Sequence, residues 1–221
     1  MAKHLKLFET TAAYEAAESS LILPNVSVCL DMPTTVYYNP FDPYNGHEYV
    51  DLGLPSGTKW ATKNIGANSE AEYGKYYGYG KGERDYSMTS GETPYTGTEN
   101  PLASSADTAT QLWGSKWHIP TREQFKELTA NTNCELLSSG YKFINKNDSS
   151  KYIILPYSGF YNQGSTIISS RDSRGTYMSS NSLYSDALYI YTFEFVKSDM
   201  WNNGCDGGYD KRNTPIRPVT E

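Results

Sequence analysis

The chain has few of the residues that build catalytic and metal centres. Its 221 residues include three histidines and three cysteines, and Cys29, Cys134 and Cys205 are far apart with no CxxC pair. An odd number of widely spaced cysteines does not make a disulfide framework. There is no glycine-rich phosphate loop and no GxSxG segment. These absences weigh against the common enzyme classes, and the sequence predicts no catalytic residue, no cofactor and no metal ligand.

Basic clusters and long apolar runs are also missing. The formal net charge is −6, and lysine and arginine do not gather anywhere, which argues against a nucleic acid or an anionic membrane as partner. No stretch approaches the roughly 20 apolar residues of a membrane span. The first residues, MAKHLKLFETTAAYEAAESS, contain no apolar core or cleavage site. We therefore expect synthesis in a cytoplasm without the usual export signal, and no membrane insertion.

Tyrosine, by contrast, is abundant. The chain has 20 tyrosines against seven phenylalanines and four tryptophans. Tyrosine packs at the edges of a β-rich core, and it also supplies rigid contact area with a polar tip in binding loops. We expect the tyrosines to divide between these two uses.

A boundary is predicted near residue 45. Residues 9–19 are rich in helix formers, and residues 21–40 favour two short strands that form a hairpin. The segment FDPYNGHE then brings proline, asparagine and glycine together, which is typical of a linker. The interpretation is a small N-terminal segment, residues 1–45, followed by a domain over residues 46–221.

Local patterns in the domain predict an α+β fold. EYVDLGLPSGTKWAT reads as a strand, a tight turn and a second strand, and NSEAEYGKYYGYG as a short helix with a capping box from Ser69 to Glu72. Residues 81–110 read as a long loop. WHIPTREQFKELTANTN predicts a second helix with Thr121 as N-cap and Gln124 at the third position. The stretches YKFIN, KYIILPYSGF, ALYIYTFEFV and TPIRPV then predict antiparallel strands.

Individual residues give weak chemical signals. His118 stands beside Trp117 before a helix, where packing is the favoured interpretation, and a general acid/base pair among the helical carboxylates stays open. WNN at residues 201–203 differs from the Trp-Asn-Asp triplet of calcium-dependent lectins. Asp199, Asp206 and Asp210 could supply some oxygen ligands, so a structural calcium also stays open.

Five segments in order resemble one family: EYVDLGLPSGTKWATKNIGA, EYGKYYGYG, LWGSKWHIPTREQFKEL, ILPYSGF and RNTPIRPV. Over residues 48–219 the chain resembles the FISUMP, or major paralogous domain, family of gut bacteria and their phages. The resemblance implies a C-type-lectin-like fold of the formylglycine-generating-enzyme type. Some members are variable proteins of diversity-generating retroelements, and the residue types at 181–186 and 202–209 are compatible with such diversification. That it took place here stays open, because Gly, Asn and Asp also mark ordinary loops.

The N-terminal stretch resembles a leader of phage-encoded structural proteins of the same bacterial group. This resemblance implies a virion protein that binds other virion proteins through residues 1–45, with a homo-oligomer left open.

The family resemblance also implies roles for core residues. Trp60, Trp113 and Trp117 are expected to form one aromatic cluster. The segment Ile216–Val219 is expected to pair with the first strand of the domain, and the closing strand is expected to be pinned by Arg212 and Arg217. A rigid scaffold of this kind can carry a variable surface, and the loop at residues 198–211 would display it.

The predicted ligand surface combines that loop with one face of ALYIYTFEFV. Because strand side chains alternate, we expect Tyr189, Tyr191, Phe193 and Phe195 to face the core and Leu188, Ile190, Thr192 and Glu194 to face outward. An apolar-aromatic patch rimmed by amides marks a binding site. The predicted ligand-binding residues are Asn181, Tyr184, Leu188, Ile190, Trp201, Asn202, Asn203, Asp206 and Tyr209.

The sequence therefore predicts a non-catalytic phage virion protein that recognises a host-surface glycan or protein. Two alternatives stay open: a structural decoration or assembly protein of a phage particle, and a bacterial surface binding protein. An enzyme of formylglycine-generating type is disfavoured, since it would need Cys134 and Cys205 to act at one site.

Overall fold

The computed structural model describes residues 43–80, 97–162, 165–183, 189–197, 207–208 and 212–221. Contacts divide the chain into the units Met1–Gly46 and His47–Glu221. Everything below concerns the second unit. The helix, hairpin and attachment role predicted for residues 1–45 lie outside the described residues and stay predictions.

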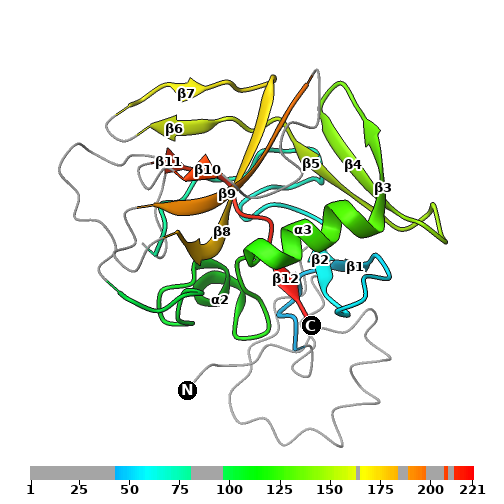
Figure 1. The fold of residues 1–221 in the computed structure, drawn as a ribbon, viewed down its shortest axis with the longest axis horizontal. Coiled ribbons are helices and arrows are strands. Elements are labelled where there is room, and N and C mark those ends of the chain that lie inside the picture. Colours follow the sequence, from blue (N-terminus) through cyan, green and yellow to red (C-terminus); the bar gives the residue numbers. More distant parts are fainter. Residues whose placement is uncertain (1–42, 81–96, 163–164, 184–188, 198–206, 209–211) are drawn as a thin grey trace, which may run out of the picture. The chain divides into compact units, whose positions relative to one another are not determined.

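The described part of the second unit contains two short helices and four three-stranded antiparallel sheets (Figure 1). The sheet orders are β1-β2-β12, β10-β9-β8, β11-β6-β7 and β3-β4-β5. This confirms a mixed, α+β architecture. The elements are β1 (Tyr49–Asp51), β2 (Lys59–Ala61), α2 (Thr108–Trp113), α3 (Arg122–Asn131), β3 (Thr132–Leu136), β4 (Gly140–Asn145), β5 (Tyr152–Pro156), β6 (Phe160–Asn162), β7 (Ile168–Ser169), β8 (Arg174–Ser182), β9 (Ile190–Val196), β10 (Gly207–Gly208), β11 (Arg212–Asn213) and β12 (Val219–Thr220).

Helix α3 forms as its sequence predicts. The Thr121 side chain accepts a hydrogen bond from Gln124 N, and the Gln124 side chain accepts one from Thr121 N at 2.8 Å. This reciprocal capping box satisfies two backbone donors that the first turn leaves free. Phe125 and Leu128 are buried and hold α3 against β4, β8 and β9.

The core under α3 is largely aromatic. Phe125 stacks on Phe193 with ring centroids 4.9 Å apart and meets Trp60 at 5.3 Å. Phe195 lies 5.6 Å from Phe193 and stacks on Tyr177 at 6.2 Å. Offset and tilted ring pairs of this kind each add about 0.5–1.5 kcal/mol to the burial of their area. They join α3 to β2, β8 and β9.

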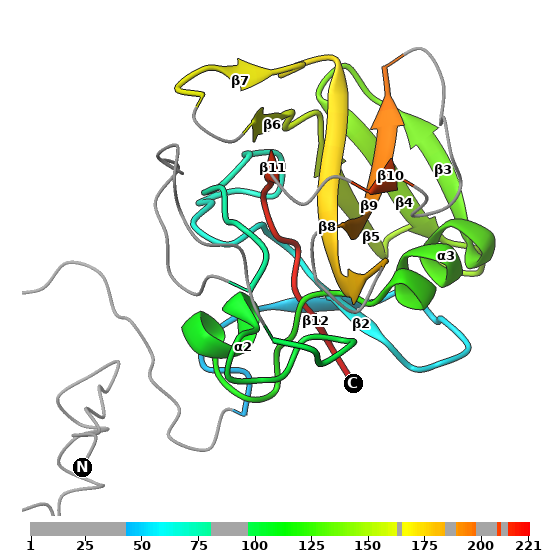
Figure 2. The same ribbon diagram turned by 60° about the vertical axis from the view of Figure 1, so that its left-hand side comes forward.

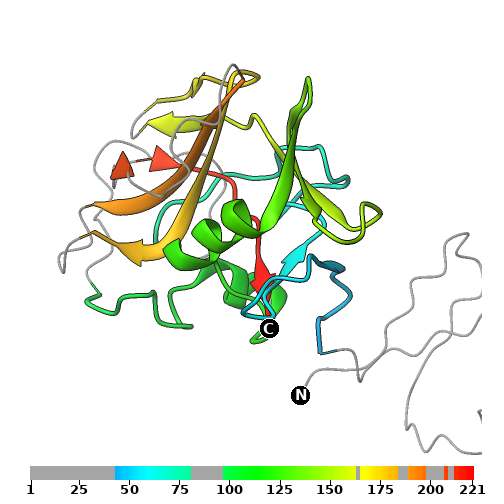
Figure 3. The same cartoon turned by 45° about the vertical axis from the view of Figure 1, so that its right-hand side comes forward.

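The sheet β1-β2-β12 unites the two ends of the unit, as Figure 3 shows with β2 beside β12. The predicted turn at residues 54–58 is present: Gly57 N donates to Leu54 O at 2.9 Å, and Gly57 has φ 80°, which suits glycine. The predicted pairing of the closing strand needs a correction. β12 pairs with β2, Val219 opposite Trp60, and not with β1.

The expectation of one tryptophan cluster also needs a correction. Trp60, Trp113 and Trp117 are all buried, but Trp60 packs in the core under α3. Trp113 and Trp117 form a separate edge-to-face pair with centroids 5.2 Å apart, and His47 stacks on Trp113 at 3.7 Å.

The helix predicted at residues 68–80 is wrong. Residues 68–72 form turns and bends, and two carbonyl groups that a helix would use accept hydrogen bonds from side chains outside the segment. Asn64 Nδ2 donates to Tyr73 O at 2.9 Å, and Arg217 Nη2 donates to Glu70 O at 3.3 Å. Gly74 has φ 72°, and a Cβ there would lie 2.4 Å from a backbone oxygen. Tertiary contacts override the local capping signal here.

Strand β8 is the longest element of a sheet, yet its sequence RGTYMSSNS gives no alternating pattern. Its residues from Gly175 to Ser180 are all buried. A strand covered on both faces has no polar side to reveal it. Helix α2 begins within residues 81–110, expected to be a loop, and extends past them to Trp113; its N-cap is Asp107, whose carboxylate accepts from Thr110 N at 2.9 Å.

Candidate functional site

Most of the predicted ligand surface lies outside the described residues. This applies to Tyr184, Leu188, Trp201, Asn202, Asn203, Asp206 and Tyr209, and to the calcium candidates Asp199, Asp206 and Asp210. Their roles stay predictions. The structure does describe the strands between which these residues stand.

Those strands form one antiparallel arrangement. β8 pairs with β9, with Ser182 opposite Ile190, so the connection between them leaves and returns at neighbouring positions. β10 pairs with the first half of β9, Gly208 opposite Tyr191. The connection after β10 therefore starts at the same end of β9 as the β8–β9 connection. Figure 2 shows β8 and β9 side by side, with β10 next to β9.

The expected facing of β9 is partly wrong. Phe193 and Phe195 are buried in the core as predicted. Ile190 and Thr192, expected to face outward, are 0% exposed, whereas Tyr189, expected inside, is 43% exposed. Both faces of this strand are covered over most of its length, so alternation does not separate core from surface. Ile190 offers no accessible area to a ligand in this arrangement.

Asn181, another predicted ligand residue, already serves the framework. Its Oδ1 accepts from Arg122 N at 2.8 Å, and its Nδ2 donates to Asn100 Oδ1 at 2.9 Å. The amide thus joins the end of β8 to the first turn of α3 and to the segment at residue 100. Its contact with a ligand stays a prediction.

An ionic and aromatic clamp holds the opposite part of the β8–β9 pair. Glu194 Oε1 lies 2.6 Å from Arg212 Nη1, and Glu194 Oε2 lies 3.2 Å from Arg174 Nη1. The Arg212 guanidinium also lies 3.9 Å from the centre of the Phe160 ring. These contacts tie β8, β9, β11 and β6 together. The expectation that Arg212 and Arg217 pin the C-terminal segment is confirmed, because Arg217 is fully buried and hydrogen-bonded.

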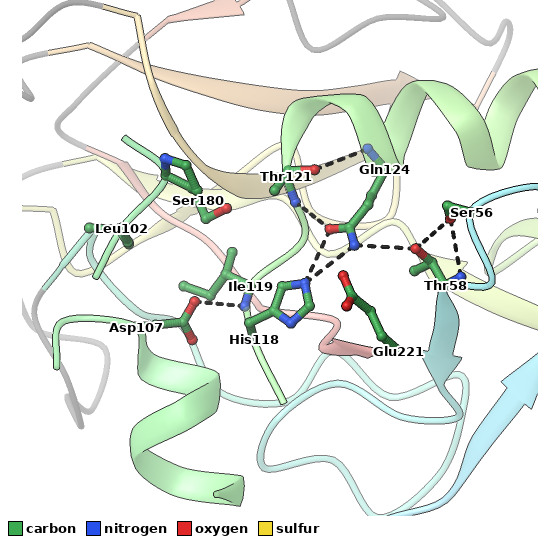
Figure 4. A pocket seen from close by; sticks show the side chains of 11 residues that line it. Ser56, Thr58, Leu102, Asp107, His118, Ile119, Thr121, Gln124, Ser180 and Glu221 are labelled. Carbon is green, nitrogen blue, oxygen red and sulfur yellow. Dashed lines mark hydrogen bonds between the residues drawn. The ribbon is translucent and has the colours of Figure 1, made fainter. Parts of the chain in front are cut away.

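A pocket of about 390 Å³ lies beside the N-terminus of α3 (Figure 4). It is assembled from segments far apart in the sequence, which is why no local pattern predicted it. Its lining consists of Ser56, Thr58, Pro101, Leu102, Asp107, His118, Ile119, Thr121, Gln124, Ser180 and Glu221.

One wall of the pocket is a continuous chain of hydrogen bonds. Ser56 Oγ donates to Glu127 Oε2 at 2.5 Å and lies 2.7 Å from Thr58 Oγ1. Gln124 Nε2 donates to Thr58 Oγ1 at 3.2 Å and lies 3.3 Å from His118 Nε2. His118 Nε2 also lies 3.3 Å from Gln124 Oε1, so the tautomer of the imidazole decides which atom of the Gln124 amide it bonds.

Asp107 contributes a buried carboxylate. Its Oδ1 accepts from Thr110 N at 2.9 Å and its Oδ2 from Ile119 N at 2.8 Å. Burial raises the pKa of Asp107, while these backbone donors oppose that shift. Both oxygens serve the backbone, so Asp107 fixes the pocket wall instead of orienting His118.

Ser180 is different, because its hydroxyl has no partner. The residue is 2% exposed, and its Oγ is a buried polar atom without a hydrogen bond. Its backbone is fixed: Ser180 N donates to Pro120 O at 2.8 Å, and its carbonyl accepts from Leu102 N at 2.8 Å. Figure 4 shows the hydroxyl pointing into the site on the side of Thr121.

The pocket does not hold a nucleophile–base pair in this structure. Ser180 Oγ makes no hydrogen bond, His118 contacts Gln124, and Asp107 is taken up by backbone amides. No sequence pattern indicated that Ser180 or Gln124 would line a pocket. The capping box identified Gln124 only as part of the start of a helix.

Within the described ranges, no group of three or more His, Cys, Asp or Glu side chains is placed to hold a metal ion. The described helices include none that is long and apolar enough to span a bilayer. Cys134 is exposed and unpaired; Cys29 and Cys205 lie outside the described residues, so their thiol state stays a prediction.

No protein-family model, curated protein or solved structure matches the chain.

Proposed function

We propose that the chain is a non-catalytic recognition protein whose C-type-lectin-like domain presents residues 184–188, 198–206 and 209–211 to a host-surface glycan or protein. One observation carries this proposal: the three segments are the consecutive connections between β8, β9, β10 and β11, and the clamp holds three of these strands, β8, β9 and β11. Seven of the nine predicted ligand residues fall in them. Binding residues concentrate on loops that a rigid scaffold positions.

The composition of these segments supports the same function. They contain Trp201, Tyr184 and Tyr209 among Asn, Ser, Asp and Gly. Tryptophan and tyrosine supply large contact area with little conformational entropy to lose, while the small polar residues adapt their hydrogen bonds.

The finer assignments rest on resemblance. The FISUMP-like segments support the C-type-lectin-like fold, and the leader-like N-terminus supports a virion protein attached to its particle through residues 1–45. The mixed fold with small antiparallel sheets is compatible with this assignment.

The test is adsorption of the fluorescently labelled full chain to a panel of intact gut-bacterial strains. The parent protein is expected to bind a subset of strains. Trp201→Ala and Tyr209→Ala each remove an aromatic anchor, which costs about 2 kcal/mol or more, or about thirtyfold in affinity. Both variants should keep a melting temperature within a few degrees of the parent.

Two control variants separate binding from folding. Tyr49→Ala removes a tyrosine that is 38% exposed in β1 and should bind like the parent. Trp117→Ala removes a fully buried ring and should unfold the unit. If Trp201→Ala destabilises the protein as much as Trp117→Ala does, Trp201 is a core residue and this surface is not the site. Failure of the parent to bind any strain favours the decoration or assembly alternative.

A further inference from the structure

We propose that the pocket beside α3 binds a small, uncharged, hydroxyl-rich molecule, the chemistry of a single pyranose sugar unit. This site goes beyond the proposed recognition surface. None of its lining residues is among the predicted ligand residues in the three segments, and its test does not depend on adsorption to cells.

The unpartnered hydroxyl of Ser180 is the first observation. A buried polar group without a hydrogen bond loses its interactions with water and gains nothing in return. Ser180 Oγ is held by a backbone that is bonded on both sides, and it points into the pocket. A ligand hydroxyl is a suitable partner, because each hydroxyl can donate and accept.

The charges of the pocket restrict the ligand. Two carboxylates, Asp107 and Glu221, belong to the lining, and the described lining residues include no lysine or arginine. An anionic ligand would meet these carboxylates with no described lysine or arginine to compensate them, which disfavours phosphates and carboxylates. Asp107 is already satisfied by backbone donors, so it does not call for an ammonium group either.

The pocket lining mixes apolar and polar side chains. In Figure 4, Leu102 and Ile119 lie on the same side as Asp107 and Ser180, whereas Thr58 and Gln124 lie on the other. A pyranose has both C–H groups and hydroxyls, and these suit such a mixed lining. The volume of about 390 Å³ lies at the lower end of small-molecule sites, enough for one such ring and its substituents.

The experiment uses the full chain and a panel of methyl pyranosides with gluco, galacto, manno, N-acetylglucosamine and 6-deoxy configurations. Saturation-transfer NMR and the shift of the melting temperature with sugar concentration report binding. At least one pyranoside is expected to bind. Ser180→Ala should weaken that binding about tenfold, because one ligand hydroxyl then loses its partner.

Thr176→Val is the matched control. Thr176 lies in the same strand, is 0% exposed and also has an unpartnered hydroxyl, but it does not line the pocket. Both variants remove a buried, unsatisfied hydroxyl, so both should keep the parent's stability. Thr176→Val should bind the pyranoside like the parent, and this separates a ligand contact from a general effect on the strand.

Three results would overturn the proposal. The first is that the parent protein binds no pyranoside. The second is that Ser180→Ala binds the pyranoside as tightly as the parent does. The third is that Ser180→Ala and Thr176→Val lose the same amount of affinity for the pyranoside. Glucosamine is included as a charged probe: its binding without that of any neutral pyranoside would assign the pocket to cations instead. Comparison of methyl glycosides with the free reducing sugars distinguishes the terminal unit of a glycan from a free monosaccharide.

Discussion

Arg217 Nε donates a hydrogen bond to Asn64 Oδ1 at 2.8 Å, and the same asparagine donates through Nδ2 to Tyr73 O at 2.9 Å. The Arg217 guanidinium also donates to four backbone carbonyl groups, those of Ala61, Thr62, Glu70 and Ile154. Burial lowers the pKa of Arg217, and these oxygen acceptors stabilise its charged form. Arg217 thus connects its own segment near the C-terminus to three others, at residues 61–64, 70 and 154.

Arg217→Met should therefore destabilise the unit strongly. It leaves several buried acceptors without a donor, and the expected loss is about 3–5 kcal/mol in the free energy of unfolding, measured by urea denaturation. Arg217→Lys should be more stable than Arg217→Met but less stable than the parent, because an ammonium group cannot reproduce the planar set of donors. The control is Lys126→Ala, which breaks an exposed pair with Glu123 and should change stability by less than about 0.5 kcal/mol. Equal denaturation midpoints for Arg217→Met and Lys126→Ala would contradict this account.

Glu194→Gln should loosen the clamp between the sheets. The carboxylate is 14% exposed and bonds two arginines, so its neutralisation should cost about 1–3 kcal/mol. Adsorption to cells should fall by more than the increase in unfolded protein explains, because the clamp holds the strands beside residues 198–206 and 209–211. Glu135→Gln, which breaks an exposed pair with Lys142 at 3.7 Å, is the matched control and should leave both properties unchanged.

The unit should lose stability at alkaline pH through Tyr177. Burial raises the pKa of Tyr177 above its ordinary value of about 10. The folded state then keeps a proton that the unfolded state releases, so this contribution is complete below about pH 10 and is lost as the pH rises above it. Urea denaturation at pH 8 and 11 should show the decrease, and Tyr177→Phe should show a smaller one. An identical pH dependence for the parent and Tyr177→Phe would exclude Tyr177 as the source.

A protein lacking residues 1–45 should fold alone. The described core and all four sheets lie within the unit His47–Glu221. The shortened protein should unfold cooperatively in urea and stay in solution. If it aggregates while the full chain does not, the predicted boundary is wrong and the N-terminal segment completes the core.

The sequence predicts best the helices and turns that depend on residues close together in the chain. Helix α3 has its cap, its box residue and its buried Phe125 and Leu128 within one short stretch, and the turn at residues 54–58 is equally local. The helix predicted at residues 68–80 fails because two side chains outside the segment, the nearby Asn64 and the distant Arg217, donate hydrogen bonds to its carbonyl groups.

Two kinds of feature could not be predicted from the sequence: the burial of strands on both faces, and a pocket that is assembled from distant segments. β8 has no alternation because both of its faces are covered, and for the same reason the outward face predicted for Ile190 is wrong. The pocket could not be predicted at all, since Ser180 is an ordinary serine until residues 101–121 are folded against it.

The pairing of Ser182 with Ile190 has a practical consequence for protein engineering. A replacement for residues 183–189 needs only to bridge two positions that already lie opposite each other in the sheet. Doubling the length of a flexible insert costs only about 0.6 kcal/mol in closure entropy. Foreign sequences of varied length can therefore be grafted between these two strands, which makes the unit a candidate scaffold for displaying selected peptides.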